Sequence, residues 1–331
     1  MERFALAAAV VLGFALTAAL CSLFVPLRRV LERREQQQQP VQSEQPRPAP
    51  LRAPLWGGLC AAAGTVAAVG VGWLAACVGH PELLGSESRL MTRLLTALAG
   101  SLAFGAVGLA EDLARMRSPA ALGLRRDVRL LLEALAAAFV LLLLRAAGCL
   151  PRGLGVPGAG YVLLGSAVPF LWAVLMVALA ECARVAERDE GTVCGAAFVA
   201  MLALMMAEAG LGVPGLAVLP AALAGALVAL LLWAFPPARL GVGCCGSLLA
   251  AGAIGCIPLS LDMTSLTVPL ALPFWAAGGL LAAQLLGAKR TGKPLRCWVK
   301  KHKMSPETVF LCSFALSAVG YVLALALLRW C

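Results

Sequence analysis

Two adjacent acidic residues at the end of an apolar segment are the first candidates for chemistry in this chain. The segment GAVGLAEDLARMR, residues 105–117, runs from an apolar helix into Glu111 and Asp112 and then into arginines. A carboxylate at the end of a membrane helix is costly unless it holds a cation or meets water. We therefore expect the functional site here. The alternative is an acidic pair that only balances Arg115.

A second acidic pair, Glu187 and Glu190, lies in ECARVAERDEGTVCG, residues 181–195. The two glutamates are three residues apart, and Arg184 stands three residues before Glu187, so a helix would place all three on one face. This spacing suits a divalent-cation site, and it also suits solvated ion pairs. Both interpretations stay open.

The 12 cysteines and two histidines are not spaced as a metal site. No C-x-x-C pair occurs, and most of the cysteines fall in apolar segments, where a thiol packs as a small hydrophobic group. We expect neither a disulfide framework nor a Cys/His metal cluster.

The elements that position these residues are membrane helices. Hydrophobic residues make up 61% of the chain and charged residues 13%, with a mean hydropathy of +0.89. This composition predicts an all-α, polytopic membrane bundle that forms one domain over residues 1–331. Ten apolar runs are long enough to span a bilayer: 4–27, 55–78, 90–110, 128–147, 161–180, 192–213, 216–235, 240–261, 266–288 and 309–328.

Basic residues orient the predicted bundle. Most of the 27 Lys and Arg fall in alternate loops on one side, which the positive-inside rule assigns to the cytoplasm, with both termini outside. Residues 28–54, glutamine-rich and then proline-rich, predict a flexible cytoplasmic loop, and residues 289–308 predict a basic cytoplasmic loop.

The net charge of +10 lies beside anionic headgroups, so we expect membrane lipids and no nucleic acid as partners. The first span is expected to be a retained helix, not a cleaved signal.

Five short motifs follow one another in an order that resembles a known family. PLWGGL opens the second span, GLAEDL closes the third and ECARVAERDEGTVCG bridges the fifth and sixth. GVGCCGSL enters the eighth, and TGKP follows the ninth. This order resembles the polyprenyl-phosphate N-acetylhexosamine-1-phosphate transferases of glycosyltransferase family 4, and most closely their peptidoglycan branch, the phospho-N-acetylmuramoyl-pentapeptide transferases. The resemblance covers nearly the whole chain.

The resemblance implies a phosphoryl transfer at the cytoplasmic face of the plasma membrane. In that family a polyprenyl phosphate attacks a UDP-sugar, Mg²⁺ assists, and uridine monophosphate leaves. Glu111 and Asp112 stand at the family's Asp-Asp pair, and Glu187 and Glu190 stand at its two later aspartates. Cys244 stands where the family has its metal-binding aspartate. A mostly protonated thiol is a poor ligand for Mg²⁺, so no metal is expected on Cys244.

Other motif positions also depart from the family. Glu181 and Arg184 replace two asparagines, and Arg296, Cys297 and Trp298 replace three histidines. A basic group remains available for a lipid phosphate: Arg115, Arg117, Lys289, Arg290 and Lys293.

Two hypotheses follow from these departures. The favoured one is a catalytically impaired or inactive relative, a pseudoenzyme that retains the lipid groove. The alternative is an active divergent transferase that uses Glu111, Asp112, Glu187 and Glu190. In both, polyprenyl phosphate is the expected lipid ligand and a UDP-sugar the expected second substrate. A homodimer or a partner membrane protein stays open.

Overall fold

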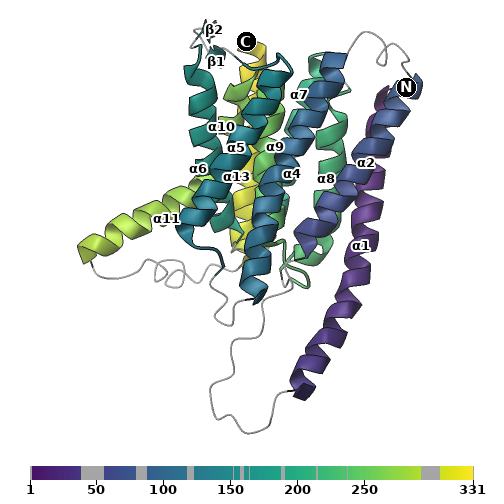
Figure 1. Cartoon of the computed structure of the whole chain (residues 1–331), viewed down its shortest axis with the longest axis vertical. Helices are drawn as coiled ribbons and strands as arrows, with labels where there is room; N and C mark the ends of the chain where they lie inside the picture. Colours follow the sequence, from purple (N-terminus) through teal and green to yellow (C-terminus); the bar gives the residue numbers. More distant parts are fainter. Residues whose placement is uncertain are drawn as a thin grey trace.

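The computed structural model is a bundle of helices lying roughly side by side (Figure 1). It describes residues 2–38, 56–79, 88–117, 123–151, 153–156, 160–163, 165–187, 191–213, 215–236, 238–291 and 306–330. Its helices are α1 (Glu2–Gln38), α2 (Gly57–Gly79), α4 (Ser88–Arg117), α5 (Arg126–Ala146), α6 (Ala167–Ala186), α7 (Thr192–Gly210), α8 (Val218–Ala234), α9 (Gly243–Ser260), η1 (Thr264–Leu266), α10 (Thr267–Leu270), α11 (Leu272–Thr291) and α13 (Pro306–Trp330).

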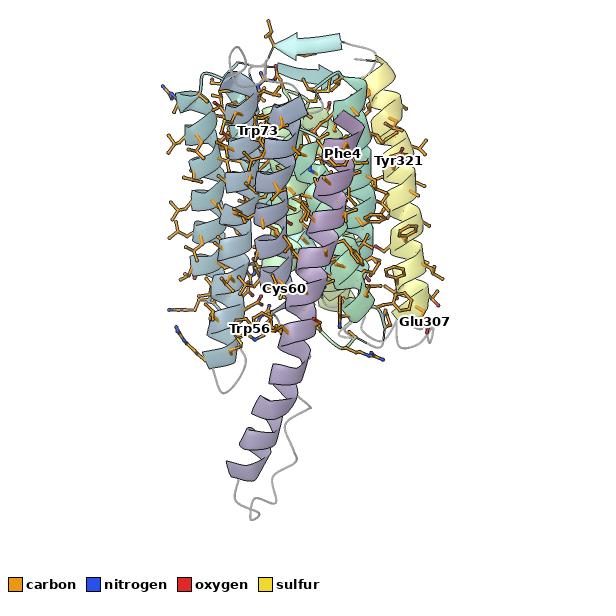
Figure 2. The ribbon with its side chains drawn as sticks, turned by 90° about the vertical axis from the view of Figure 1, so that its right-hand side faces the viewer. Phe4, Trp56, Cys60, Trp73, Glu307 and Tyr321 are labelled. Carbon is orange, nitrogen blue, oxygen red and sulfur yellow. The ribbon has the colours of Figure 1, made fainter. Side chains whose placement is uncertain are left out.

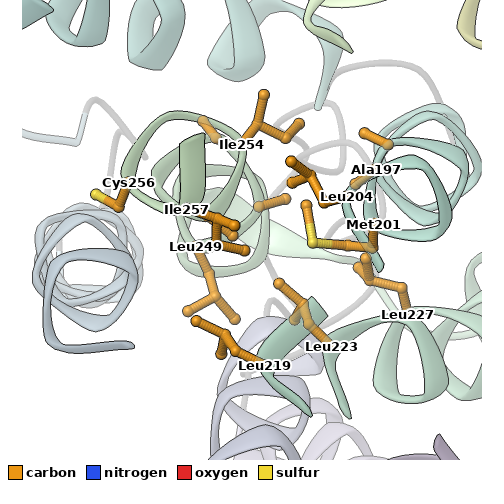
Figure 3. Packing of buried hydrophobic residues seen from close by; sticks show 14 of the residues in the cluster. Ala197, Met201, Leu204, Leu219, Leu223, Leu227, Leu249, Ile254, Cys256 and Ile257 are labelled. Atoms are coloured by element: carbon orange, nitrogen blue, oxygen red, sulfur yellow. The ribbon is translucent and has the colours of Figure 1, made fainter. Parts of the chain in front are cut away.

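Helix α9 is the centre of the bundle, and every one of its residues is buried. Its sequence is rich in Gly, Ala and Cys, which let neighbouring backbones approach closely. Larger side chains fill the space between α7, α8 and α9 (Figure 3). On α8, Leu219, Leu223 and Leu227 recur every four residues and so lie on one face, toward Met201 of α7 and Leu249 of α9.

Each of the ten predicted spans contains a helix, but fewer meet the criterion for a membrane span. Within the described residues, seven helices are long and apolar enough to cross a bilayer: α1, α2, α4, α6, α7, α9 and α13. Helix α8 has only 17 residues. Helix α5 carries Arg129 and Glu133 in its first half, and α11 ends on Lys289, Arg290 and Thr291. The chain is a polytopic helical membrane protein.

The fold is all-helical as predicted, apart from one short β-hairpin among the described elements. Strands β1 (Gly153–Val156) and β2 (Gly160–Leu163) pair antiparallel, with Gly153 opposite Leu163 and Val156 opposite Gly160. The predicted fifth span, 161–180, therefore begins too early, because α6 starts at Ala167 and runs to Ala186. Gly165 between hairpin and helix has φ +59°, a conformation that glycine tolerates best.

Proline shifts the ninth span. Where one helix from 266 to 288 was predicted, the chain forms η1, the short α10 and then α11. Pro269 lies in α10, and Pro273 lies in the first turn of α11, where its missing N–H costs nothing.

Helix α1 extends to Gln38, so residues 28–38 of the predicted cytoplasmic loop are helical. Arg, Glu and Gln are good helix formers, which explains why the helix continues past the end of its apolar segment. Residues 289–291 and 306–308 of the predicted basic loop likewise lie in α11 and α13. The remainder of both loops, 39–54 and 292–305, lies outside the described residues.

The two termini lie at the same end of the bundle, as predicted (Figure 1). Figure 2 places Phe4, Trp73 and Tyr321 toward that end and Trp56, Cys60 and Glu307 toward the other. The end opposite the termini also receives the last residues of α4 and α6 and the first residues of α5 and α9. Its assignment to the cytoplasm stays a prediction.

Candidate functional site

Three helix ends bring the predicted acidic residues and Cys244 together. Glu111 and Asp112 lie near the end of α4, Glu187 directly follows α6, and Cys244 lies at the start of α9. The thiol of Cys244 donates a hydrogen bond to Glu187 Oε2 (3.6 Å), and the Cys244 N–H donates one to Asp112 Oδ1 (3.1 Å). The expected convergence of these three motifs is therefore present in the structure. Glu190 and Lys293 lie outside the described residues.

Asp112 caps helix α9. Its Oδ1 accepts the N–H of Cys244 and its Oδ2 accepts the N–H of Cys245 at 2.9 Å, two donors that an isolated helix leaves unpaired. The negative charge also faces the positive end of the α9 dipole. Asp112 is 1% exposed, and both of its carboxylate oxygens accept N–H groups of α9. These two hydrogen bonds hold the start of α9 against α4.

Glu111 is surrounded by arginines from three helices. Its Oε1 accepts a hydrogen bond from Arg115 (2.9 Å) and lies 3.8 Å from Arg129 Nη1. Its Oε2 pairs with Arg184. Glu111 is 2% exposed, so these guanidinium groups take the place of water around it.

A further acid, Glu133 on α5, joins this arrangement and was missed by sequence reasoning. It is fully buried and pairs with Arg184, which thereby bridges Glu111 and Glu133. Arg129, one turn earlier on α5, makes a two-pronged pair with Glu181 at 2.9 and 3.0 Å. The available signal was a single acid inside an otherwise apolar run, placed four residues after a base.

These residues form one network, which we call the ion-pair cluster. It consists of the acids Glu111, Asp112, Glu133, Glu181 and Glu187 and the bases Arg115, Arg129 and Arg184. The pairing of Glu111 and Asp112 with Arg115 agrees with the ion-pair alternative stated for the first acidic motif. For the second motif both interpretations stay predictions, because Glu190 lies outside the described residues. Arg115 links the two motifs, because its Nη1 lies 3.5 Å from Glu187 and 3.9 Å from Asp112.

The donor set of the described residues does not fit Mg²⁺, which requires several free oxygen ligands in octahedral geometry. Both oxygens of Asp112 accept backbone N–H groups, and Glu111 is held by guanidinium groups. Cys244 contributes a buried thiol, not an oxygen. Within the described part of the chain, no group of three or more His, Cys, Asp and Glu side chains is arranged to hold a metal ion.

The predicted phosphate-binding bases that the structure describes lie on two helices, α4 and α11. Arg115 belongs to the ion-pair cluster, and Arg117 is exposed at the end of α4. Lys289 and Arg290 lie in the last turn of α11, whose end projects away from the bundle and lies apart from the end of α4 (Figure 1). Sequence reasoning passed over Arg125 and Arg126 as phosphate ligands, yet both are exposed at the start of α5, whose Arg129 enters the cluster.

Motif glycines hold the site together by close packing. The N–H groups of Gly57 and Gly58 donate to the carbonyls of Gly241 and Val242 (3.2 and 2.9 Å). A Cβ on Gly58 would lie 2.1 Å from the Gly246 nitrogen, and one on Gly108 would lie 2.2 Å from the Cys244 carbonyl oxygen. The PLWGGL and GLAEDL motifs therefore dock directly on α9.

A polytopic helical bundle with a charged site where motif-bearing helix ends meet defines a class of integral membrane protein, and the family comparison narrows that class. Residues 94–262, about half of the chain and reaching from within α4 to just past α9, match the model of glycosyl transferase family 4. The chain belongs to this family.

Two curated relatives are phospho-N-acetylmuramoyl-pentapeptide-transferases. The protein from Synechococcus sp. (strain RCC307) is 30% identical over 212 residues, which cover 63% of this chain and 55% of that protein. The protein from Geobacillus kaustophilus (strain HTA426) is 25% identical over 296 residues, which cover 88% of this chain and 86% of that protein. The match to the Synechococcus protein thus spans about half of its length.

Proposed function

We propose that this chain is a catalytically impaired family 4 relative that binds polyprenyl phosphate and transfers sugar phosphate poorly or not at all. One observation supports this above the others: Arg184 lies between Glu111 and Glu133, where its guanidinium supplies the positive charge that buried acids require. Guanidinium groups of the chain itself already pair with the acids of the described site, and Cys244 adds no hard oxygen ligand.

Phosphate binding needs none of the missing ligands. The exposed guanidinium groups of Arg117, Arg125 and Arg126 lie at the ends of α4 and α5, beside the ion-pair cluster. Arginine recognises phosphate oxygens through two parallel N–H donors, so these residues provide the polar end of a lipid-phosphate site. The apolar helix faces would accommodate the polyprenyl chain.

Binding is tested with the full chain in nanodiscs and polyprenyl phosphate, with the unphosphorylated polyprenol as reference ligand. We expect binding that depends on the phosphate and weakens as salt rises. The double variant Arg117→Gln/Arg126→Gln should bind less. Arg145→Gln is the matched control, because Arg145 is exposed at the opposite end of α5. Equal binding of the two lipids would contradict the proposal.

Transfer is tested with the same preparation, a UDP-sugar labelled in the sugar and polyprenyl phosphate, beside an active family 4 transferase. We expect product at background level, with or without a chelator. The variant Cys244→Asp should not restore turnover, because Glu181 and Arg184 also replace family residues. Robust transfer by the unmodified chain, abolished by chelation, would overturn the proposal.

The alternative is an active divergent transferase, and one observation favours it. The ion-pair cluster contains five carboxylates and three guanidinium groups, which leaves two formal negative charges. Glu187 and Glu181 have side chains 12% and 32% exposed, so a divalent cation could reach them. Melting temperatures with and without millimolar Mg²⁺ discriminate the two functions. If the chain is catalytically impaired, we expect the same melting temperature with and without Mg²⁺. A melting temperature that rises with Mg²⁺, and no longer rises in Asp112→Ala, would support the active transferase.

A further inference from the structure

Helices α1 and α2 pack along a seam of small residues. The two run in opposite directions, and a Cβ on Gly64 would lie 2.1 Å from Thr17 Oγ1 and 3.1 Å from the Thr17 nitrogen. One on Gly72 would lie 3.0 Å from the Cβ of Ala9. Going from Ala9 to Thr17 on α1 therefore matches going from Gly72 to Gly64 on α2, which fixes the register of the pair.

The next step of this register places two cysteines opposite each other. Four residues beyond Thr17 lies Cys21, and four residues before Gly64 lies Cys60. Their exposed fractions are 0% and 1%, and the register sets their side chains face to face between the two helices. Just beyond them, the rings of Phe24 and Trp56 stack with centroids 5.6 Å apart and planes 9° apart. The side chains around the pair are thus held in place on both sides.

Two more buried thiols lie nearby but are not part of this contact. Cys194 on α7 interacts with Cys21, and Cys245 on α9 interacts with Cys60. The cysteines of the described residues are free thiols. The register of α1 on α2 and the Phe24–Trp56 stack single out Cys21 and Cys60, because a disulfide needs its two sulfur atoms to come together without backbone movement.

We propose that Cys21 and Cys60 are an oxidisable dithiol that a lipid-soluble hydroperoxide converts into a disulfide joining α1 to α2. One thiol attacks the peroxide, the O–O bond breaks, and an alcohol leaves as that sulfur becomes a sulfenic acid. The second thiol then attacks the sulfenic sulfur, which forms the S–S bond and releases water. The two thiols lose two electrons in total, and the hydroperoxide is reduced to alcohol and water.

The class of oxidant follows from the position of the pair. Both sulfur atoms lie within candidate membrane spans, Phe4–Phe24 and Gly57–Val78. Helix α1 is at the side of the bundle in Figure 1, and only 28% of its span is buried. We expect a reagent dissolved in the bilayer to reach the pair from the face of α1 that the bundle leaves uncovered, whereas a water-soluble peroxide must first partition into the membrane.

The disulfide would close the chain between positions 21 and 60 and hold α1 on the bundle. A cross-link stabilises a fold mainly by restricting the unfolded chain, so oxidation should raise the melting temperature by several degrees. The effect requires no catalytic activity and is independent of the proposed function.

The test uses the full chain in nanodiscs treated with cumene hydroperoxide, followed by thiol blocking, proteolysis and mass spectrometry without reductant. We expect a linked pair of peptides containing Cys21 and Cys60, formed faster than with hydrogen peroxide and reversed by a reductant. The melting temperature should rise in the unmodified chain and in Cys194→Ala, but not in Cys21→Ala or Cys60→Ala.

Three results would overturn the proposal: no cross-link, a link that joins Cys60 to Cys245 or Cys21 to Cys194, or faster oxidation by hydrogen peroxide. Peptide mapping on the unmodified chain decides the first two even if a variant fails to fold.

Discussion

At the scale of residues, Arg184 controls how the buried acids are tolerated. It is about as buried as a core residue, at 7% side-chain exposure, and two of its neighbours are carboxylates with 2% and 0% exposure. Removing ions from water is costly, and only their mutual attraction offsets that cost. The three residues therefore act as one unit.

Replacing Arg184 by methionine should lower the free energy of unfolding by about 3–5 kcal/mol, because it leaves Glu111 and Glu133 buried without their shared base. Unfolding in detergent, followed by circular dichroism, measures this loss. Arg117→Met is the control: Arg117 is exposed on α4, and we expect a change within about 0.5 kcal/mol. Equal effects of the two substitutions would show that Arg184 is not the centre of the network.

Asp112 should be required for the docking of α9. In Asp112→Ala the N–H groups of Cys244 and Cys245 lose their acceptor inside the bundle, at about 1–3 kcal/mol for each unsatisfied group. Asp127→Ala provides the comparison, because Asp127 is an exposed acid in the first turn of α5. Its loss should cost less than about 1 kcal/mol. Thermal unfolding of both variants without added metal tests the difference, and similar losses would contradict the capping role.

At the scale of helices, α9 is positioned by backbone contact as well as by charge. Gly58 and Gly108 let α2 and α4 approach its first turn, and the indole of Trp172 on α6 donates a hydrogen bond to the Gly255 carbonyl (3.2 Å). Three helices are thereby fixed against α9, and these short contacts let the acids of α4 and α6 converge at its first turn.

Gly58→Ala should therefore destabilise the protein by about 1–3 kcal/mol, because its new methyl group meets the backbone of Gly246 and not a movable side chain. The matched substitution is Gly70→Ala on the same helix, where a Cβ has no neighbour within 4 Å. It should stabilise the helix by about 0.5–1 kcal/mol. Melting temperatures that shift in the same direction for both would exclude close packing as the cause.

The sequence predicted the helices better than their ends or their contacts. Apolar runs placed a helix in every predicted span because membrane helices must be long and apolar. The start of α6 was wrong because Tyr161 and Val162 are apolar yet lie in β2, and hydropathy does not separate strand from helix. Glu133 was overlooked because one acid hardly changes the hydropathy of a run. Its partner Arg184 lies 51 positions away, a pairing only the fold reveals.

At the scale of the whole molecule, the bundle has two chemically different ends. One carries both termini, and the other carries the ion-pair cluster with its rim of exposed arginines (Figures 1 and 2). Arginine and lysine are retained on the cytoplasmic side of membranes, so the end with the cluster should face inward. The family match, residues 94–262, contains every residue of the ion-pair cluster.

This orientation is testable with epitope tags in the full chain. A tag before Met1 or after Cys331 should bind antibody on intact spheroplasts, whereas a tag inserted after Gln38, at the end of α1, should bind only after permeabilisation. The reason is that the Arg-rich stretch near the end of α1 would have to cross the membrane in the opposite topology, and each translocated charge is costly. The three tags form an internal control, because their accessibility must split two against one. Antibody binding to the Gln38 tag alone on intact spheroplasts would reverse the orientation and place the ion-pair cluster outside, where no cytoplasmic UDP-sugar could reach it.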